Sequence, residues 1–228
     1  KVFIYYPAYL ILNVSKHKTK LNMIYQNANL KTVKIDNVSI GLREFGKGKE
    51  VFFIHGFPTH GYTWRKIIPK LTKNYKCNVI DLPGLGDSKW SSDTKFDSKS
   101  QALYIIRLIE KMEISKCSLI AHNSGATIAR VIAIEKPNLI EKLILINTEI
   151  PNHRPPWIPF YQRVGLLPLV PNLIRKALSQ NWFIKSSMGF KEAYTDISML
   201  NNPNNLAPYI KLIISSKKPK GISSSHSS

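Results

Sequence analysis

The sequence predicts an α/β fold in which a mostly parallel sheet is covered by helices on both faces. Short, continuously apolar runs at residues 51–54 and 143–146 are typical of strands that are buried on both sides. Segments with helical periodicity separate these runs along the chain. Strict alternation of strands and helices is the pattern of a parallel sheet.

Length and composition indicate a globular chain with one sizeable core. The chain has 228 residues, of which 43% are hydrophobic and 21% charged, so it is not of the disordered class. We expect an N-terminal apolar and basic extension at 1–30, a core at 31–150 and a partial helical lid at 151–212. The lid segment is broken by prolines and rich in aromatics. The Lys- and Ser-rich tail at 213–228 is predicted to be disordered.

The formal charge of +19 comes mostly from lysines that are spread along the whole chain. No single element concentrates arginines and aromatics, so we expect no nucleic-acid partner and favour a solvated lysine surface. Cys77 and Cys117 each begin a predicted core strand, which indicates buried free thiols. Their spacing fits neither a disulfide framework nor a metal site, and we expect no metal and no cofactor.

An apolar run at residues 2–14 opens the chain but is interrupted by Pro7 and is too short to span a bilayer. It has no clear signal-peptide cleavage site, so we expect a cytoplasmic protein. Two interpretations of the run stay open. Residues 2–20 contact a membrane surface, which would make the protein peripheral, or the run docks on the domain.

Each core element has its own signal. Alternating apolar and polar residues at 31–36 and 38–45 predict an antiparallel hairpin that turns at Asp36 and Asn37. Residues 51–54 and 78–81 read as buried strands with a helix at 62–71 between them. A capping box at 98–101, starting at Ser98, opens a helix with Ile105 and Ile109 on one face. A helix at 126–133 then separates the strands 117–120 and 143–146.

The turn between the strand at 117–120 and the helix at 126–133 reads Ala121-His122-Asn123-Ser124-Gly125. A small residue two positions before and two after the apex is the spacing of a nucleophile elbow. Ala121 and Gly125 meet this requirement around Asn123. An apex asparagine is a poor nucleophile, and asparagine also tolerates left-handed backbone angles. From these five residues alone, an elbow and a simple turn are equally compatible.

A second loop, His55-Gly56-Phe57-Pro58, directly follows the strand at 51–54. The glycine lets the backbone turn sharply, so that the next N–H group can point into a pocket beside the elbow. The N–H groups of Phe57 and Ser124 would then form a two-donor oxyanion hole. His55 belongs to this loop and is expected to brace it.

These motifs, taken together, resemble the α/β-hydrolase superfamily, in particular the branch of epoxide hydrolases and haloalkane dehalogenases. The matching pieces are residues 52–59 with Trp64, residues 81–88 and the elbow, and the resemblance covers roughly 35–150. In that branch an apex Asp attacks carbon to give an ester, and a later His activates the water that releases it. The resemblance places the nucleophile position at Asn123 and the oxyanion donors at Phe57 and Ser124. It also makes Glu149 a candidate triad acid, with a hydrogen-bonded loop carboxylate as the alternative.

The departures from that pattern decide what we expect of this chain. The apex is Asn, and the base His belongs after last strands that this chain does not contain. We therefore expect a C-terminally truncated fold with an exposed apolar sheet edge. Two functions stay open: a hydrolase of the epoxide, carbon–halogen or ester type that is inactive as this chain, or a non-catalytic binding protein. The expected ligand is a small apolar molecule. Hydrolysis of Asn123 to Asp is not expected without the base His.

Overall fold

The computed structural model describes residues 2–5, 24–57, 59–148, 173, 176–177, 180–186 and 191. The chain divides into two compact units, one of residues 1–149 with 218–228 and one of residues 150–217. The sheet lies in the first unit. In the second unit the structure describes a short helix, α7 (Asn181–Ile184).

The sheet has eight strands in the order β1-β8-β7-β4-β5-β3-β2, with β6 paired to β3. From β1 through β8, β7 and β4 to β5, each strand runs parallel to the next. β3 pairs antiparallel with β5, and β2 and β6 pair antiparallel with β3. This mostly parallel, mixed sheet confirms the predicted fold class. The strands are β1 (Val2–Tyr5), β2 (Leu30–Ile35), β3 (Val38–Phe45), β4 (Lys49–Ile54), β5 (Tyr75–Ile80), β6 (Lys89–Trp90), β7 (Cys117–His122) and β8 (Ile140–Ile146).

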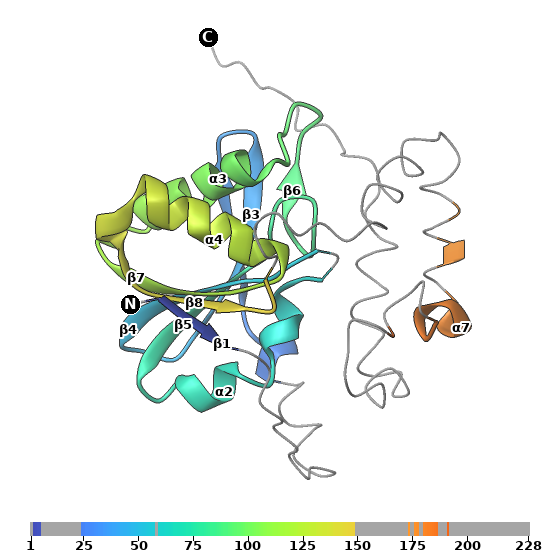
Figure 1. Cartoon of the computed structure of the whole chain (residues 1–228), viewed down its shortest axis with the longest axis horizontal. Helices are drawn as coiled ribbons and strands as arrows, with labels where there is room; N and C mark the ends of the chain where they lie inside the picture. The colour runs from blue at the N-terminus through green and yellow to red at the C-terminus, as the bar shows by residue number, and fades with distance from the viewer. Residues whose placement is uncertain are drawn as a thin grey trace. The chain divides into compact units, whose positions relative to one another are not determined.

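Helices cover both faces of this sheet (Figure 1). α3 (Ser98–Lys111) and α4 (Ser124–Glu135) pack side by side on one face, and α2 (Ile68–Leu71) lies on the other. The described part of this unit also contains two short 3-10 helices, η1 (Gly61–Trp64) and η2 (Pro137–Leu139). The core between the sheet and its α3–α4 layer is apolar. Its fully buried members include Phe52, Ile54, Ile80, Ile105, Ile109 and Leu119.

Two predicted elements differ in detail from the structure. The single helix expected at 62–71 is instead η1 followed by α2. Pro69 lies in the first turn of α2, where its missing N–H is tolerated, but it cannot continue a helix from the preceding turn. The N-cap of α3 is Asp97, not Ser98, because the Asp97 carboxylate accepts the Ser100 N–H at 2.9 Å. Cys77 and Cys117 are buried free thiols, as predicted.

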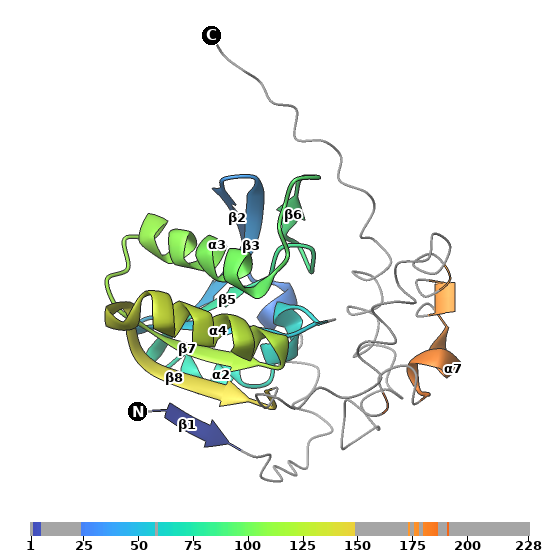
Figure 2. The same ribbon diagram turned by 45° about the horizontal axis from the view of Figure 1, so that its top comes forward.

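The exposed edge expected beside the last strand is covered by the beginning of the chain. β1 pairs in parallel with β8, with Phe3 opposite Ile144, so this expectation was wrong for the described residues (Figure 2). Pairing gives the outer backbone groups of β8 hydrogen-bond partners, which an open edge would lack. Residues 2–5 therefore dock on the domain. Residues 6–20 lie outside the described residues, and their contact with a membrane stays a prediction.

Tyr25 belongs to the core although it falls within the predicted extension. Its side chain is 4% exposed and stacks on Phe45, with ring centroids 5.8 Å apart. The edge of Tyr62 meets the same ring at 5.5 Å, and the Arg43 guanidinium lies over it at 5.0 Å. The packed part of the chain thus begins before residue 31.

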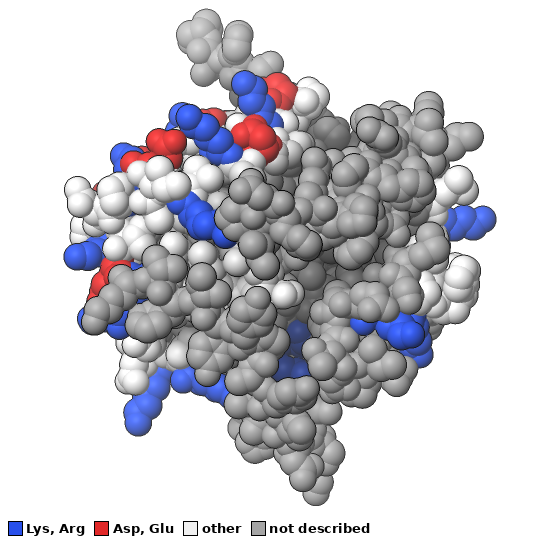
Figure 3. Space-filling model, viewed as in Figure 1, with Lys and Arg blue, Asp and Glu red and all other residues white. Residues whose placement is uncertain are grey.

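Charged side chains of both signs mark the surface of the sheet-bearing unit. In Figure 3, Lys and Arg side chains stand among Asp and Glu side chains on the face shown. Several pairs are close enough for ion pairing, such as Lys136 with Glu110 at 2.9 Å and Lys76 with Glu44 at 3.1 Å. Within the described ranges, none of the helices has the length and apolar run that crossing a membrane requires.

Candidate active site

Asn123 forms the apex of a sharp turn between β7 and α4. Its φ of 55° and ψ of −129° lie in a region that residues other than glycine rarely adopt. The backbone is held on both sides, because the Asn123 N–H donates to the Ile146 carbonyl at 3.1 Å and the Ala126 N–H donates to the Asn123 carbonyl at 2.9 Å. The turn therefore has the backbone geometry expected of an elbow. The role of Asn123 in chemistry stays a prediction.

Close backbone approach explains why small residues surround this apex. A Cβ on Gly125 would lie 2.3 Å from the His55 carbonyl oxygen, and one on Gly56 would lie 2.5 Å from the Cβ of Asn123. Both distances are far below van der Waals contact, so any larger residue would force the two loops apart. Gly125 was predicted from the elbow spacing. The need for Gly56 goes beyond the predicted sharp turn, since this glycine also touches the apex.

The two predicted oxyanion donors lie at this junction, and each has an acceptor within the chain. The Phe57 N–H donates to the Ser124 hydroxyl oxygen at 2.9 Å. The Ser124 N–H donates to the side-chain oxygen of Asn123 at 2.7 Å. A ligand oxygen at this position would have to replace these two internal acceptors. Donation by these groups to a ligand stays a prediction.

His55 braces the loop through both ring nitrogens. The Leu82 N–H donates to His55 Nε2 at 2.9 Å, and His55 Nδ1 lies 3.1 Å from the Gly56 carbonyl oxygen. Because a carbonyl only accepts, these partners assign the proton to Nδ1 and leave the ring neutral. Burial lowers the pKa of His55, although the nearby Asp81 charge opposes the shift. With its Nε2 lone pair already engaged, His55 has no free basic nitrogen.

The other two described histidines also have structural surroundings. His60 Nδ1 accepts the Tyr62 N–H at 3.3 Å and so caps η1. Burial lowers the pKa of His60 to about 4. The ring of His122 packs perpendicular to the ring of Trp64, with the ring centroids 6.4 Å apart. Burial lowers the pKa of His122, and the neighbouring His55 adds to the shift. Glu149, His153 and His226 lie outside the described residues.

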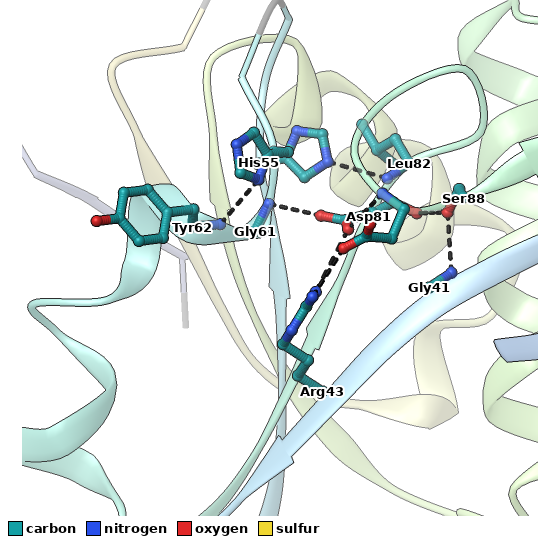
Figure 4. Close-up of polar contacts among 10 residues, drawn as sticks. Gly41, Arg43, His55, Gly61, Tyr62, Asp81, Leu82 and Ser88 are labelled. Carbon is teal, nitrogen blue, oxygen red and sulfur yellow. Dashed lines mark hydrogen bonds and ion pairs between the residues drawn. The ribbon is translucent and has the colours of Figure 1, made fainter. Parts of the chain in front are cut away.

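A buried carboxylate that the sequence did not single out ties the loops around the site together (Figure 4). The Asp81 side chain is 1% exposed and accepts the N–H groups of Gly61 at 2.7 Å and Asp87 at 2.9 Å. The Arg43 guanidinium lies 3.7 Å from Asp81 and donates to Asp87 at 2.7 Å. A Cβ on Gly86 would lie 2.3 Å from the Asp81 carboxyl carbon, so the second loop wraps closely around this side chain.

The Asp81 network extends to its backbone and to its neighbours. The Ser88 hydroxyl donates to the Asp81 carbonyl at 2.5 Å and accepts the Gly41 N–H at 2.9 Å. Burial, followed by the charge of Asp81, raises the pKa of Tyr25 well above its ordinary value. The signal in the sequence was an aspartate at the end of a buried strand, just before two glycines. Its partners Gly61 and Arg43 could not be predicted, because they come from other parts of the chain.

Known proteins share the fold of this chain. A family model described as alpha/beta hydrolase fold matches residues 50–184, which is more than half of the chain. The soluble epoxide hydrolase of Corynebacterium sp. (strain C12) is 31% identical over 102 residues, covering 45% of this chain and 35% of that protein. Epoxide hydrolase 4 of Mus musculus is 32% identical over 108 residues, covering 46% of this chain and 30% of that protein.

A solved structure titled epoxide hydrolase CorEH without ligand superposes with a TM-score of 0.68 at 20% identity. It matches 83% of this chain and 69% of its own, and at that identity it supports the fold alone. The matched part of this chain spans only about a third of the length of the two epoxide hydrolases from Corynebacterium and Mus musculus. The elbow at Asn123, the loop at His55 and the matched family model together show that the chain belongs to the α/β-hydrolase fold family, where it resembles the epoxide hydrolases.

Proposed function

We propose that this chain carries the nucleophile and oxyanion part of a hydrolase site of the epoxide-hydrolase type, and that the chain itself does not turn substrate over. One observation carries the proposal. The residue held in the elbow geometry is Asn123, whose side-chain oxygen accepts the Ser124 N–H at 2.7 Å. The site thus has the backbone of a nucleophile elbow and a neutral amide in place of its nucleophile.

The chemistry of a carboxamide explains the absence of turnover. An apex carboxylate attacks carbon through a full negative charge, whereas the amide oxygen is uncharged and here already accepts a hydrogen bond. An ester between Asn123 and a substrate carbon is therefore not expected. Hydrolysis of such an ester would also need a base. Among the described histidines, His55 has both ring nitrogens engaged and His60 caps η1.

The substrate class is proposed from the resemblance and from the site. The two N–H groups at Phe57 and Ser124 suit an oxygen that gains negative charge, as an epoxide or ester oxygen does when it is attacked. The Phe57 side chain is 70% exposed, which leaves an apolar ring beside these donors. A small apolar molecule that bears one such oxygen fits both features. Haloalkanes remain within the class that the resemblance implies.

Steady-state assays of the freshly prepared chain with epoxides, haloalkanes and esters test the proposal. We expect no turnover by the chain and none by Asn123→Ala, which serves as the matched control. Turnover by the chain that disappears in Asn123→Ala would contradict the proposal, because it would show the amide position working as the nucleophile.

A second candidate function is a binding protein on the hydrolase fold. The observation that favours it is the internal pairing of both predicted oxyanion donors, which leaves the site satisfied without a ligand. Such a protein would bind a small apolar molecule by contact with side chains alone. Calorimetric titration of the chain with an epoxide and with its deoxygenated analogue separates the two functions. Equal affinities favour the binding protein, and a clear preference for the epoxide favours the hydrolase-type site.

A further inference from the structure

The backbone of Asn123 brings its side chain against the nitrogen of the next residue. The substituents of a tetrahedral Cα are spaced evenly around the Cα–C bond. For an L residue, a ψ of −129° therefore places Cβ nearly eclipsed with the C–N bond to Ser124. The 2.7 Å distance from Ser124 N to the Asn123 side-chain oxygen shows the side chain folded over that nitrogen. This is the arrangement needed to close a five-membered ring between the two.

We propose that Asn123 is a site of spontaneous modification, in which the Ser124 nitrogen closes a succinimide that opens to aspartate and isoaspartate. A hydroxide ion removes the Ser124 amide proton, and the nitrogen lone pair forms a bond to the side-chain carbonyl carbon of Asn123. The bond from that carbon to the amide nitrogen breaks, and ammonia leaves after taking a proton from water. The ring closure uses only atoms of this turn and water.

Water then opens the ring. Addition of hydroxide to the former side-chain carbon, with a proton returned to the Ser124 nitrogen, restores the backbone and gives aspartate. Addition to the backbone carbon gives isoaspartate instead. The net change in either case is one water consumed and one ammonia released. No histidine takes part, so this route departs from our expectation that Asn123 is stable without a base.

The fold holds the reacting groups in place. The hydrogen bonds to Ile146 and from Ala126 fix the backbone on both sides of the apex, and the close contacts of Gly56 and Gly125 prevent the turn from relaxing. Ser124 is the first residue of the twelve-residue helix α4, so its nitrogen has no carbonyl partner within the helix. The positive end of the helix dipole favours loss of the amide proton and the negative charge that develops on ring closure.

The chain offers an internal comparison for this proposal. Asn123 is the only asparagine in the 228 residues that is followed by serine or glycine, and Asn27, which precedes the small Ala28, is the comparison for the size of the next residue. Asn147 also has a positive φ, of 47°, but it precedes the β-branched Thr148. Asn37 occupies an ordinary hairpin turn between β2 and β3. If a left-handed backbone alone were sufficient, Asn147 would convert as well.

Conversion would place a carboxylate at the apex of the elbow. This consequence rests on the proposed function, because an apex carboxylate matters only if the elbow belongs to a hydrolase site. The conversion of Asn123 itself does not depend on the proposed function. The same chain would then exist in two forms, a fresh amide form and an aged carboxylate form. The fraction of the second would rise with time and with pH, because the attacking species is the deprotonated amide.

Peptide mapping of the full chain, aged in ¹⁸O-labelled water, tests the proposal. One sample is kept native and one is unfolded in urea at the same pH and temperature. We expect Asn123 to convert several-fold faster in the native sample, with one ¹⁸O taken up and both aspartate and isoaspartate present. Asn147 and Asn37 should convert no faster in the native sample than in urea. An equal or slower rate at Asn123 in the native chain would overturn the proposal.

A second variant tests the ring itself. Ser124→Pro removes the amide proton at a helix position that accepts proline, so conversion at residue 123 should cease in native and unfolded chain alike. Continued conversion, or aspartate formed without any isoaspartate in the wild type, would show direct attack by water and overturn the ring route. Both readouts come from peptide mapping and do not use activity, so failure of the proposed function in assays would not alter them.

Discussion

The Phe57 N–H donates to the hydroxyl oxygen of Ser124 at 2.9 Å, which joins the loop after β4 to the first residue of α4. The two residues are 67 positions apart in the sequence. Both were predicted to offer backbone donors to a ligand. The structure adds that the side chain of one is the acceptor for the other, so the Ser124 hydroxyl controls whether the Phe57 N–H is available.

Removing that hydroxyl should open the Phe57 donor to small oxyanions. In Ser124→Ala the Phe57 N–H loses its acceptor, and an unsatisfied donor gains from any oxygen that reaches it. We expect the Phe57 amide signal to shift on titration with acetate in an NMR ¹H–¹⁵N spectrum, and to shift much less in the wild type. Ser92→Ala, at an exposed loop serine, is the control and should behave like the wild type. Equal shifts in all three proteins would contradict the oxyanion assignment.

Asp81→Asn should destabilise the fold strongly. The substitution removes the charge that faces Arg43 and turns an acceptor of two backbone N–H groups into a side chain that carries donors. Breaking a buried charge interaction of this kind costs about 3 kcal/mol. Urea unfolding should show a lower midpoint with an unchanged slope. Asp93→Asn, at an exposed aspartate, should leave the midpoint nearly unchanged. A midpoint for Asp81→Asn equal to that of the control would refute the bracing role.

The buried histidines should make stability fall as the solution is acidified. The pKa of His60 is lowered to about 4 in the folded chain, whereas in the unfolded chain it takes its ordinary value of about 6.5. Between these two values the unfolded state binds the extra proton, so the free energy of unfolding decreases as pH falls. The slope due to one such histidine reaches about 1.4 kcal/mol per pH unit.

His60→Asn isolates this contribution. An asparagine oxygen can accept the Tyr62 N–H and keep the cap of η1, but it does not titrate. Urea unfolding between pH 7 and pH 4 should give a shallower decline for the variant than for the wild type. Parallel declines would mean that His60 does not bind its proton preferentially in the unfolded state.

The pairing of β1 with β8 should protect the chain from association. Removing residues 1–5 would expose the outer backbone groups of β8, whose residues face Val2–Tyr5 in parallel register. Open apolar edges pair with other chains. We expect the shortened chain to form dimers or larger species in light scattering at concentrations where the full chain has its monomer mass. Identical masses for both would contradict the role of β1 as an edge cover.

Most of the core could be predicted from local patterns. The hairpin at Asp36 and Asn37, the buried strands and the apex at Asn123 each depend on residues that are close in sequence. The features that were missed depend on distant partners. The burial of Tyr25, the loops gathered around Asp81 and the pairing of β1 with β8 bring together residues that are far apart in the chain.

Two local details were missed for a different reason. Asp97 and Ser98 can both cap a helix, and only the hydrogen bond to Ser100 decides between them. The segment 62–71 has helical spacing, but Pro69 fixes where its second helix begins. At the elbow, the sequence predicted the two donors but not their internal acceptors, because the side-chain directions of Asn123 and Ser124 follow from the turn geometry.

Covalent labelling of Asn123→Asp measures most directly whether the elbow is a hydrolase site that lacks only its nucleophile and base. Freshly prepared wild type, Asn123→Asp and Asn123→Ala would each be incubated with an epoxide and followed by intact mass. The carboxylate variant should gain one epoxide equivalent at residue 123 and retain it, because we propose that this chain lacks the base that would release the ester. Wild type and Asn123→Ala should gain none. Absence of labelling at residue 123 of the carboxylate variant, with every epoxide tried, would contradict the account.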